Sequence, residues 1–275
     1  MKFITSINEG FKIALYALKT NKLRAFLTTL CIIIGITMVT IVDTVTTGMD
    51  TKFDESMAML GQNVVYIEKW PWNRGDDNWW EIMNRPEIEM EYVDFISERS
   101  RYAQTVAVSA NNSATIRHKD KSAERVGLQG ASYNYLDIQG LDIEKGRMFT
   151  ESESRSRSNV AVIGGSLVSA LFENEEALGK TIRFGGQKFL VIGILKKQGS
   201  FLGLGDQDNR IIIPITSYEK MYGLKRGLQM GIKFPDEASK DEGIFEIEGL
   251  MRQVRGLDAA EENNFAINEP DTFKE

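Results

Sequence analysis

An apolar run from Ala25 to Val42 constrains this chain more than any other feature, because threonines are the only polar interruptions in it. As an α-helix, these 18 residues would rise about 27 Å, close to the roughly 30 Å hydrocarbon core of a bilayer. The apolar region of a signal peptide is shorter, and no small-residue cleavage site follows at once. The sequence therefore predicts a transmembrane helix that the mature protein retains.

The charges that flank this run predict its orientation. The 24 residues before it contain one acidic residue, Glu9, and five basic residues: Lys2, Lys12, Lys19, Lys22 and Arg24. A basic excess on one side of a span keeps that side in the cytoplasm. We therefore expect a cytoplasmic N-terminus and an extracytoplasmic location for the residues after position 43.

Charge and cysteine usage limit what the rest of the chain can do. The net charge of −6 becomes −10 once the first 24 residues are set aside. Such an acidic balance argues against nucleic acid as a partner, because phosphate binding requires a basic face. Cys31 is the only cysteine and lies inside the apolar run, so no intrachain disulfide can form.

Residues 1–21 predict a short amphipathic helix. Its apolar residues recur at helical spacing: Ile4, Ile7, Phe11, Leu15 and Leu18. A basic amphipathic segment before a span is typical of a helix that lies in the plane of the cytoplasmic membrane surface and contacts lipid. A helix docked on another subunit fits the same pattern, and the sequence leaves both interpretations open.

The apolar spacing continues beyond the span as far as Gly61, a residue type that favours the end of a helix. The repeating residues are Val42, Val45, Met49, Phe53, Met57 and Leu60. They predict one helix over residues 22–60, a stiff rod of about 58 Å that would transmit force from the bilayer to an outer domain. Two separate helices with a break near Gly48 are the alternative.

The remaining sequence predicts an α+β fold in three parts. Residues 61–133 and 214–275 each combine strands of period two with one helix, which is a split βαβ pattern. Residues 134–213 predict an inserted, β-rich subdomain with glycine turns and one helix. In the first part we expect separate strands at "TVAVSA", "ATIRH" and "ERVGLQG", with a turn before the last.

No constellation indicates catalysis, a bound cofactor or a metal site. Gly179, Lys180 and Thr181 match only the end of a phosphate-binding loop, and they precede a predicted strand where that motif requires a helix. His118 is the sole histidine and has no cysteine or carboxylate cluster at ligand spacing. We expect it to lie on the surface beside a turn.

Glycine pairs and acidic runs also favour structural interpretations. The pairs at residues 164–165 and 185–186 are more typical of turns with positive φ than of a dinucleotide site. The carboxylates occur in runs that are typical of solvated helix and loop faces. They are Glu173, Glu175, Glu176, Asp236, Glu237, Asp241 and Glu242.

All four tryptophans fall within the eleven residues "WPWNRGDDNWW", which has a turn-like composition. They are Trp70, Trp72, Trp79 and Trp80. Tryptophan is favoured in binding pockets and at membrane interfaces. This segment is therefore a candidate contact for a partner, a lipid or a substrate. The alternative is a loop that folds its own tryptophans back over the domain.

Two stretches of the chain resemble a known family. Residues 11–40 look like the start and first membrane segment of MacB-type ABC transporter permeases, the class that includes FtsX and the lipoprotein-sorting permeases. Residues 140–197 resemble the periplasmic core domain of that family. There, five short motifs occur in the family's order: Gly-Arg-x-Phe, Val-Ala-Val-Ile-Gly, Leu-Phe, Leu-Gly-Lys and Val-Ile-Gly.

The resemblance implies a split α+β "porter" subdomain with an inserted "sabre" subdomain. It also implies a non-catalytic permease dimer in the bacterial inner membrane, working with a separate cytoplasmic ATPase that binds ATP and Mg²⁺. Periplasmic adaptors, lipoproteins or cell-wall hydrolases would be the outer partners, and efflux, lipoprotein handling or hydrolase control the output.

The chain departs from the family in one respect. Family members have four spans, whereas only one long apolar run is present here, and "FAINEPDTFKE" resembles the edge of a second span. We therefore expect the chain to be part of a longer permease. A single-pass anchored binding or sensor protein with the same outer fold is the alternative.

Overall fold

The computed structural model describes residues 9–10, 13, 16, 19–58, 63–73, 79–173, 175–198, 208–225 and 227–270. For residues 52–58 it describes the backbone alone. The chain divides into two compact units, Met1–Asp54 and Glu55–Glu275, and each is considered by itself.

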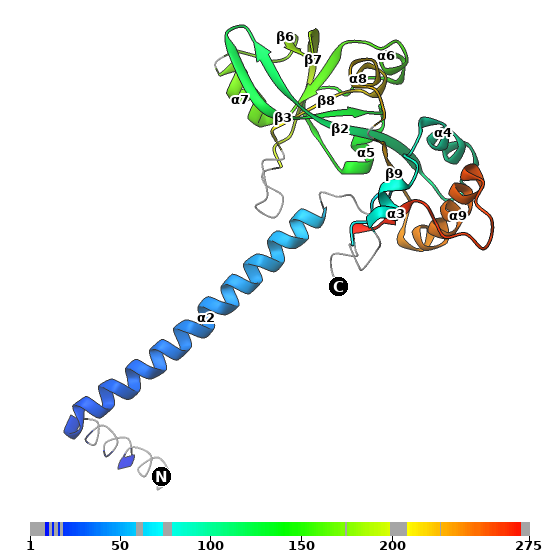
Figure 1. Cartoon of the computed structure of the whole chain (residues 1–275). Coiled ribbons are helices and arrows are strands. Elements are labelled where there is room, and N and C mark those ends of the chain that lie inside the picture. The colour runs from blue at the N-terminus through cyan, green and yellow to red at the C-terminus, as the bar shows by residue number, and fades with distance from the viewer. Residues whose placement is uncertain are drawn as a thin grey trace. The chain divides into compact units, whose positions relative to one another are not determined.

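Helix α2 spans Lys22–Ala58 and has 37 residues. It continues through Gly48 without a break (Figure 1), so the two-helix alternative is wrong. The predicted end at Leu60 lies outside the described residues. So does most of the predicted amphipathic helix at residues 1–21, although its described residues on the N-terminal side of Asn21 are helical.

The described residues of the second unit form one mixed sheet of ten strands. Nine strands follow the order β10-β1-β9-β2-β3-β8-β5-β7-β4, and β6 pairs with β2 and β7. The strands are β1 (Val64–Glu68), β2 (Thr105–His118), β3 (Lys121–Ala131), β4 (Ile143–Gly146), β5 (Val160–Ile163), β6 (Thr181–Phe184), β7 (Gln187–Leu195), β8 (Arg210–Pro214), β9 (Gln229–Lys233) and β10 (Ala266–Asn268).

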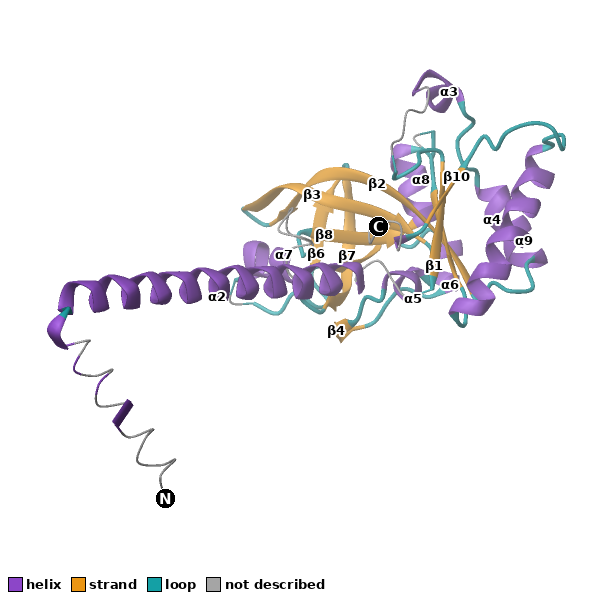
Figure 2. Ribbon diagram, turned by 90° about the horizontal axis from the view of Figure 1, so that it is seen from below, coloured by secondary structure: helices purple, strands orange, loops and turns teal. Residues whose placement is uncertain are grey.

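Seven helices accompany this sheet among the described residues. They are α3 (Trp79–Asn84), α4 (Met90–Arg99), α5 (Tyr135–Gln139), α6 (Glu151–Arg155), α7 (Gly165–Phe172), α8 (Ile215–Tyr222) and α9 (Glu237–Arg255). The long ones, α4 and α9, lie side by side against one end of the sheet (Figure 2).

The end of the sheet beneath α4 and α9 has the split βαβ topology that the sequence indicated. Helix α4 connects β1 to β2, and α9 connects β9 to β10, while the strand order is β10-β1-β9-β2. Every pairing in this part is antiparallel. Ile96 of α4 and Ile247 of α9 are fully buried, because the apolar stripe of each helix faces the sheet.

A long hairpin, β2–β3, runs from this part into the rest of the sheet. The expected separate strands "TVAVSA" and "ATIRH" are wrong, because residues 105–118 form one strand. The intervening Asn111, Asn112 and Ser113 each have a register partner in β3. The expected turn is present, with Lys119 at φ 51°.

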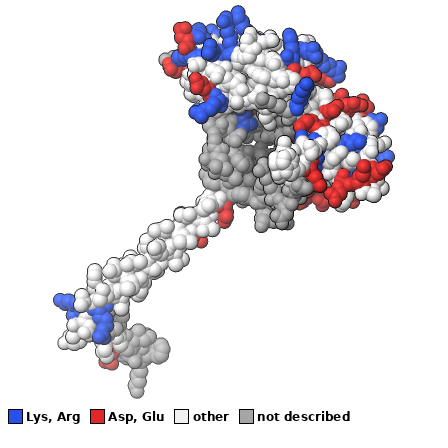
Figure 3. All heavy atoms as spheres, viewed as in Figure 1, with Lys and Arg blue, Asp and Glu red and all other residues white. Residues whose placement is uncertain are grey.

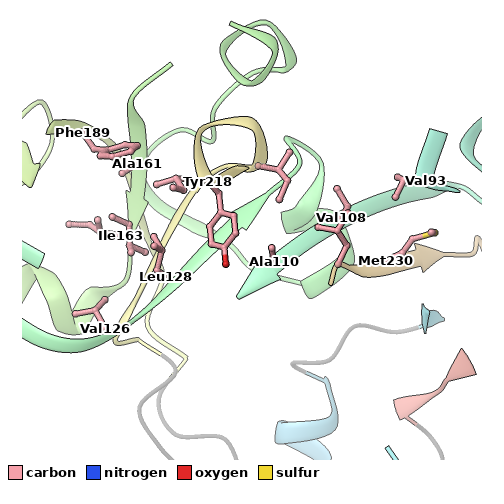
Figure 4. Packing of buried hydrophobic residues seen from close by; sticks show 14 of the residues in the cluster. Val93, Val108, Ala110, Val126, Leu128, Ala161, Ile163, Phe189, Tyr218 and Met230 are labelled. Atoms are coloured by element: carbon pink, nitrogen blue, oxygen red, sulfur yellow. The ribbon is translucent and has the colours of Figure 1, made fainter. Parts of the chain in front are cut away.

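Besides two smaller clusters of buried residues, one main hydrophobic core extends along most of the sheet. Its cluster includes Val93 of α4 and Met230 of β9 at one end, and Phe189 of β7 at the other, with Tyr218 of α8 between them (Figure 4). The parts that the sequence divides at residues 133 and 213 therefore share a sheet and a core. The names porter and sabre stay predictions.

The only parallel pairings among the described strands involve the inserted region: β5 pairs with β7 inside it, and β8 pairs with β3 of the preceding part. Gly185 and Gly186 have positive φ in the turn between β6 and β7, as expected. The same expectation for Gly164 and Gly165 is wrong. Gly164 has φ −78° and precedes α7, and a Cβ there would collide with the Asp208 carbonyl.

Candidate functional site

A cleft of about 390 Å³ lies where the β2–β3 hairpin, β8, β9 and β1 meet. Half of its twelve lining residues are asparagine or glutamine. This composition is unusual, because most ligand pockets have a mainly apolar lining. The full lining is Tyr66, Trp72, Asn111, Asn112, Gly127, Leu128, Gln129, Tyr135, Gln139, Asn209, Arg210 and Gln229.

Side-chain hydrogen bonds hold the tyrosines of this cleft in place. The Nε2 of Gln139 donates to the Tyr66 hydroxyl at 2.7 Å, and the Nε2 of Gln129 donates to the Tyr135 hydroxyl. Both tyrosines are buried. Since buried polar networks fix their members in one arrangement, the cleft is preorganised.

The phenol groups of the cleft are held in their neutral forms. Burial raises the pKa of Tyr135 to about 12 and also raises the pKa of Tyr66. Burial likewise raises the pKa of the Glu68 carboxyl, which accepts a hydrogen bond from Gln229. Amides and phenols offer both donors and acceptors. The arrangement therefore suits binding of a polar ligand through hydrogen bonds more than proton transfer.

The tryptophans separate into two groups. Trp72 lines the cleft and packs on Tyr66, with ring centroids 5.2 Å apart. Asn268 of β10 clamps the chain there: its Oδ1 accepts from the Trp72 backbone N–H at 2.9 Å, and its Nδ2 donates to the Trp70 carbonyl at 2.9 Å. The fold-back interpretation therefore describes Trp72.

Trp79 and Trp80 stay on the surface at the start of α3. Their exposed fractions are 53% and 61%, and their rings stack with centroids 4.4 Å apart. Trp70 is 41% exposed. The sequence suggested a turn for this whole stretch, whereas residues 79–84 are helical, and residues 74–78 lie outside the described residues.

A match to a family model shows which protein family this chain belongs to. The model of the MacB-like periplasmic core domain matches residues 25–250. The chain belongs to this family. The resemblance to MacB-type permeases seen in the sequence is thereby confirmed.

Several curated proteins that are similar to this chain are named MacB, in agreement with the family model. The macrolide export ATP-binding/permease protein MacB of Aggregatibacter actinomycetemcomitans is 29% identical over 269 residues, which cover 97% of this chain and 40% of that protein. MacB of Campylobacter jejuni is 29% identical over 272 residues, with the same coverages. MacB of Neisseria gonorrhoeae is 32% identical over 200 residues, which cover 72% of this chain and 30% of the relative. This chain spans about two fifths of the first two.

Solved structures share the fold. The periplasmic region of MacB from Actinobacillus actinomycetemcomitans superposes with a TM-score of 0.63 at 24% identity, covering 79% of this chain and 94% of that one. The extracellular domain of the ABC-type transporter YknZ from Gram-positive bacteria has a TM-score of 0.60 at 19% identity, covering 74% and 99%.

The Gly-Arg-x-Phe motif, which is part of the family resemblance, is structural in this chain. Gly146 has φ +80°, and a Cβ there would collide with the Ile192 carbonyl. The guanidinium of Arg147 donates to both carboxylate oxygens of Glu153 at 2.7 and 2.8 Å, and Phe149 is buried. The motif thus fixes the turn between β4 and α6 and makes no contribution to the cleft.

His118 is not a surface residue, so that prediction is wrong. Its exposed fraction is 6%, its Nδ1 lies 2.8 Å from the Thr181 carbonyl, and its ring stacks on Phe172. The Nε2 lies 3.3 Å from a carboxylate oxygen of Glu175, which also accepts from Lys119. Because β6 packs beside β2, a turn-edge position in the sequence becomes an interior one.

Some carboxylates of the acidic runs have structural partners, whereas Glu176, Glu237, Asp241 and Glu242 are exposed, as expected for solvated faces. Asp236 caps α9 by accepting from the Ser239 backbone N–H at 2.8 Å, and Glu173 pairs with Lys121 at 2.9 Å. Within the described part of the chain, no three His, Cys, Asp or Glu side chains gather as a metal site.

The predicted force-transmitting residues lie on α2 as far as the description reaches. Val42, Val45 and Met49 are exposed in this chain. Phe53 and Met57 belong to the helical backbone, but their side chains are not described, and Leu60 lies outside the described residues. Their role therefore stays a prediction.

Proposed function

We propose that this chain is the permease part of a MacB-like ABC transporter in the bacterial inner membrane. It has no catalytic role of its own. A separate cytoplasmic ATPase binds ATP and Mg²⁺ and drives a dimer of permeases, with the N-terminus in the cytoplasm and the family domain in the periplasm. Membership of the MacB-like family and the MacB relatives support this proposal.

The single observation that carries the proposal is the continuity of α2. Residues Lys22–Thr51 are long and apolar enough to span a membrane, with a mean hydropathy of 2.5 over the best window, and none of that window is buried. The same helix continues to Ala58, past the last residue of that segment. A continuous helix is stiffer than two helices joined by a hinge, so it suits transmission of movement.

The threonines of α2 are compatible with a lipid environment. The hydroxyl of Thr40 donates to the Ile36 carbonyl at 2.9 Å, and that of Thr44 donates to the Thr40 carbonyl at 2.7 Å. Thr28 and Thr29 bond to preceding carbonyls in the same way. Because the helix itself satisfies these hydroxyls, they need no water inside the bilayer.

The outer contact is the second element of the proposal. The amide-lined cleft and the exposed Trp79–Trp80 pair serve as contacts for a transported compound or for a periplasmic adaptor, lipoprotein or hydrolase. Stacked, exposed tryptophans are rare on surfaces without partners and are enriched in binding hot spots. The output is efflux, lipoprotein handling or control of an envelope partner.

Glycine insertion tests the lever. Two glycines inserted after Gly48 should leave folding and ATP hydrolysis by the assembled complex intact and abolish the ATP-driven movement of the outer domain. Movement is measured as the distance between spin labels on the exposed Phe245→Cys position of two copies, in a Cys31→Ser background.

Insertion of two alanines at the same place is the matched control, because alanine keeps the helix stiff. The label distance should still respond to ATP in that variant. An unchanged response in the glycine variant would show that α2 is not the lever.

The second candidate is a single-pass anchored binding or sensor protein. Among the described residues only one helix can span a membrane, and the cleft would hold its ligand. Purification of the native protein from its own membranes separates the two. An ABC ATPase that co-purifies in stoichiometric amounts supports the permease, and its absence supports the anchored binder.

A further inference from the structure

Three cations lie in a row across the end of the sheet that carries β6 and β7. Arg117 of β2 is the register partner of Arg183 of β6, and Arg183 is the register partner of Lys188 of β7. Partners in antiparallel strands point to the same face, with Cβ atoms about 4.5–5.5 Å apart. All three side chains are exposed.

This row costs the fold stability when nothing is bound. Like charges that lie directly opposite on neighbouring strands repel each other. No ion pair in the described part of the chain involves any of the three, whereas Lys119 and Lys121 at the adjacent turn pair with Glu175 and Glu173. The neighbouring lysines are thus neutralised, and the row is not.

The row lines a hollow of about 830 Å³. Hydroxyl groups of Thr115 and Thr181 and the Gly185–Gly186 turn share its wall, and Asp120 at the hairpin turn is its acidic member. Figure 3 shows Lys and Arg gathered at this end of the domain, while Asp and Glu are prominent over α4 and α9. A domain with an acidic balance therefore concentrates positive charge at one hollow.

We propose that this hollow binds a phosphate-bearing ligand. A phosphate monoester carries a charge of about −1.5 to −2 and three acceptor oxygens, so one or two such groups match three cations within about 10 Å. Arginine forks bind phosphate with two parallel hydrogen bonds, and the hydroxyls provide further donors. The ligand is either a soluble phosphate compound or the headgroup of a phospholipid.

Titration of the full chain in neutral detergent tests the proposal. The probes are inorganic pyrophosphate and short-chain phosphatidylglycerol, with short-chain phosphatidylcholine, a zwitterionic lipid of no net charge, as the reference. Binding of pyrophosphate identifies a soluble phosphate compound as the ligand class. Binding of phosphatidylglycerol without pyrophosphate binding identifies a lipid headgroup.

The Arg117→Gln and Arg183→Gln variants should each lower the affinity for the probe about tenfold, as expected for loss of a charge-assisted hydrogen bond. Their melting temperatures should stay equal or rise, because like-charge repulsion is relieved. Arg101→Gln, which removes an exposed cation outside the hollow, is the matched control and should bind like the wild type.

Three results would overturn the proposal. The first is the absence of binding to either phosphate probe. The second is equal weakening in the Arg101→Gln control, which would indicate non-specific attraction. The third is a hexaglutamate peptide that binds as tightly as the phosphate probes, which would assign the hollow to an acidic protein segment.

Discussion

Trp72 and the Trp79–Trp80 pair are close in sequence but differ in what their rings contact. Trp72 packs on the buried Tyr66, whereas the other two stack on each other at the surface. Their roles should therefore separate. The ring of Trp72 contributes to the packing of the β1 end, and the exposed pair is available to a partner.

Alanine substitution should show this separation. Trp72→Ala should lower the free energy of unfolding by about 2–3 kcal/mol, because a half-buried aromatic contact is lost. The double variant Trp79→Ala, Trp80→Ala should change it by less than about 1 kcal/mol, as is usual at the surface, and should weaken partner or cargo binding. Denaturant unfolding and pull-down of envelope proteins measure the two effects. A large stability loss in the double variant would place those rings in the core.

Among single residues, the sequence drew attention to the tryptophans as candidate contacts, but not to the asparagine and glutamine residues that line the cleft. Four tryptophans in eleven residues are conspicuous by composition. Asn111 and Asn112 instead lie between two expected strands, where no local pattern indicated a binding site. Their position in the cleft depends on pairing with β3 and on β8, which comes from a distant part of the chain. Only an unexpected polar interruption between two strands hinted at them.

Among the elements, the short helix α6 is stabilised by one connected group of side chains. Thr150 and Glu153 form a capping box, and Arg147 donates to Glu153. Hydrogen bonds from Arg147 are the main reason why the pKa of Glu153 falls to about 2. The folded state therefore keeps this carboxylate ionised at pH values at which the unfolded chain is protonated.

This difference has a defined sign. A lowered pKa contributes stability that is present above the usual glutamate pKa and is lost as the pH falls towards about 2. Glu153→Gln should lower the stability at pH 7 by less than about 1 kcal/mol, because solvent screens this partly exposed pair. The difference in stability between this variant and the wild type should disappear at acidic pH.

Thermal unfolding between pH 2 and pH 8 measures this gap. Glu151→Gln, which removes the exposed Glu151–Arg155 pair of the same helix, is the control and should change little. A gap of constant size across the whole range would show that the loss has another cause.

Some element types followed from local pattern, whereas the ends of the elements and the short helices α5, α6 and α8 did not. The period-3.6 stripe of Ile244, Ile247 and Met251 predicted α9, and the alternation of residues 181–195 predicted β6 and β7. The merging of two predicted strands into β2 was missed. So was the interior position of His118, because strand pairing across the chain decides both.

At the scale of the whole domain, the continuous core predicts cooperative unfolding. Phe189→Ala should cost about 3–5 kcal/mol, since the side chain is fully buried. All tryptophans lie at residues 70–80, in the part of the chain next to β1, so their fluorescence reports on the other end of the sheet. The midpoint measured by tryptophan fluorescence should shift as far as that measured by circular dichroism.

Independent subdomains would behave differently. The tryptophan signal would then keep its wild-type midpoint while the circular dichroism signal split into two transitions. Val168→Ala, a partly buried residue packed against the same core, is a milder companion variant and should shift both signals together by a smaller amount.

The sequence could indicate the split βαβ pattern because strands and helices alternate in the right order in residues 61–133 and again in residues 214–275. It could not show that the insertion continues the same sheet. That continuity comes from the length of β2 and β3 and from parallel pairing of β3 with β8, which no local pattern encodes.

The position of β9 also determines the order in which parts of this domain can assemble. It lies between β1 and β2 and pairs with both, yet it is synthesised long after them. Until then, β1 and one edge of β2 have open backbone groups that invite wrong pairings. This half of the domain can close only after β9 has been made, so chains that have not yet reached that point need protection from one another.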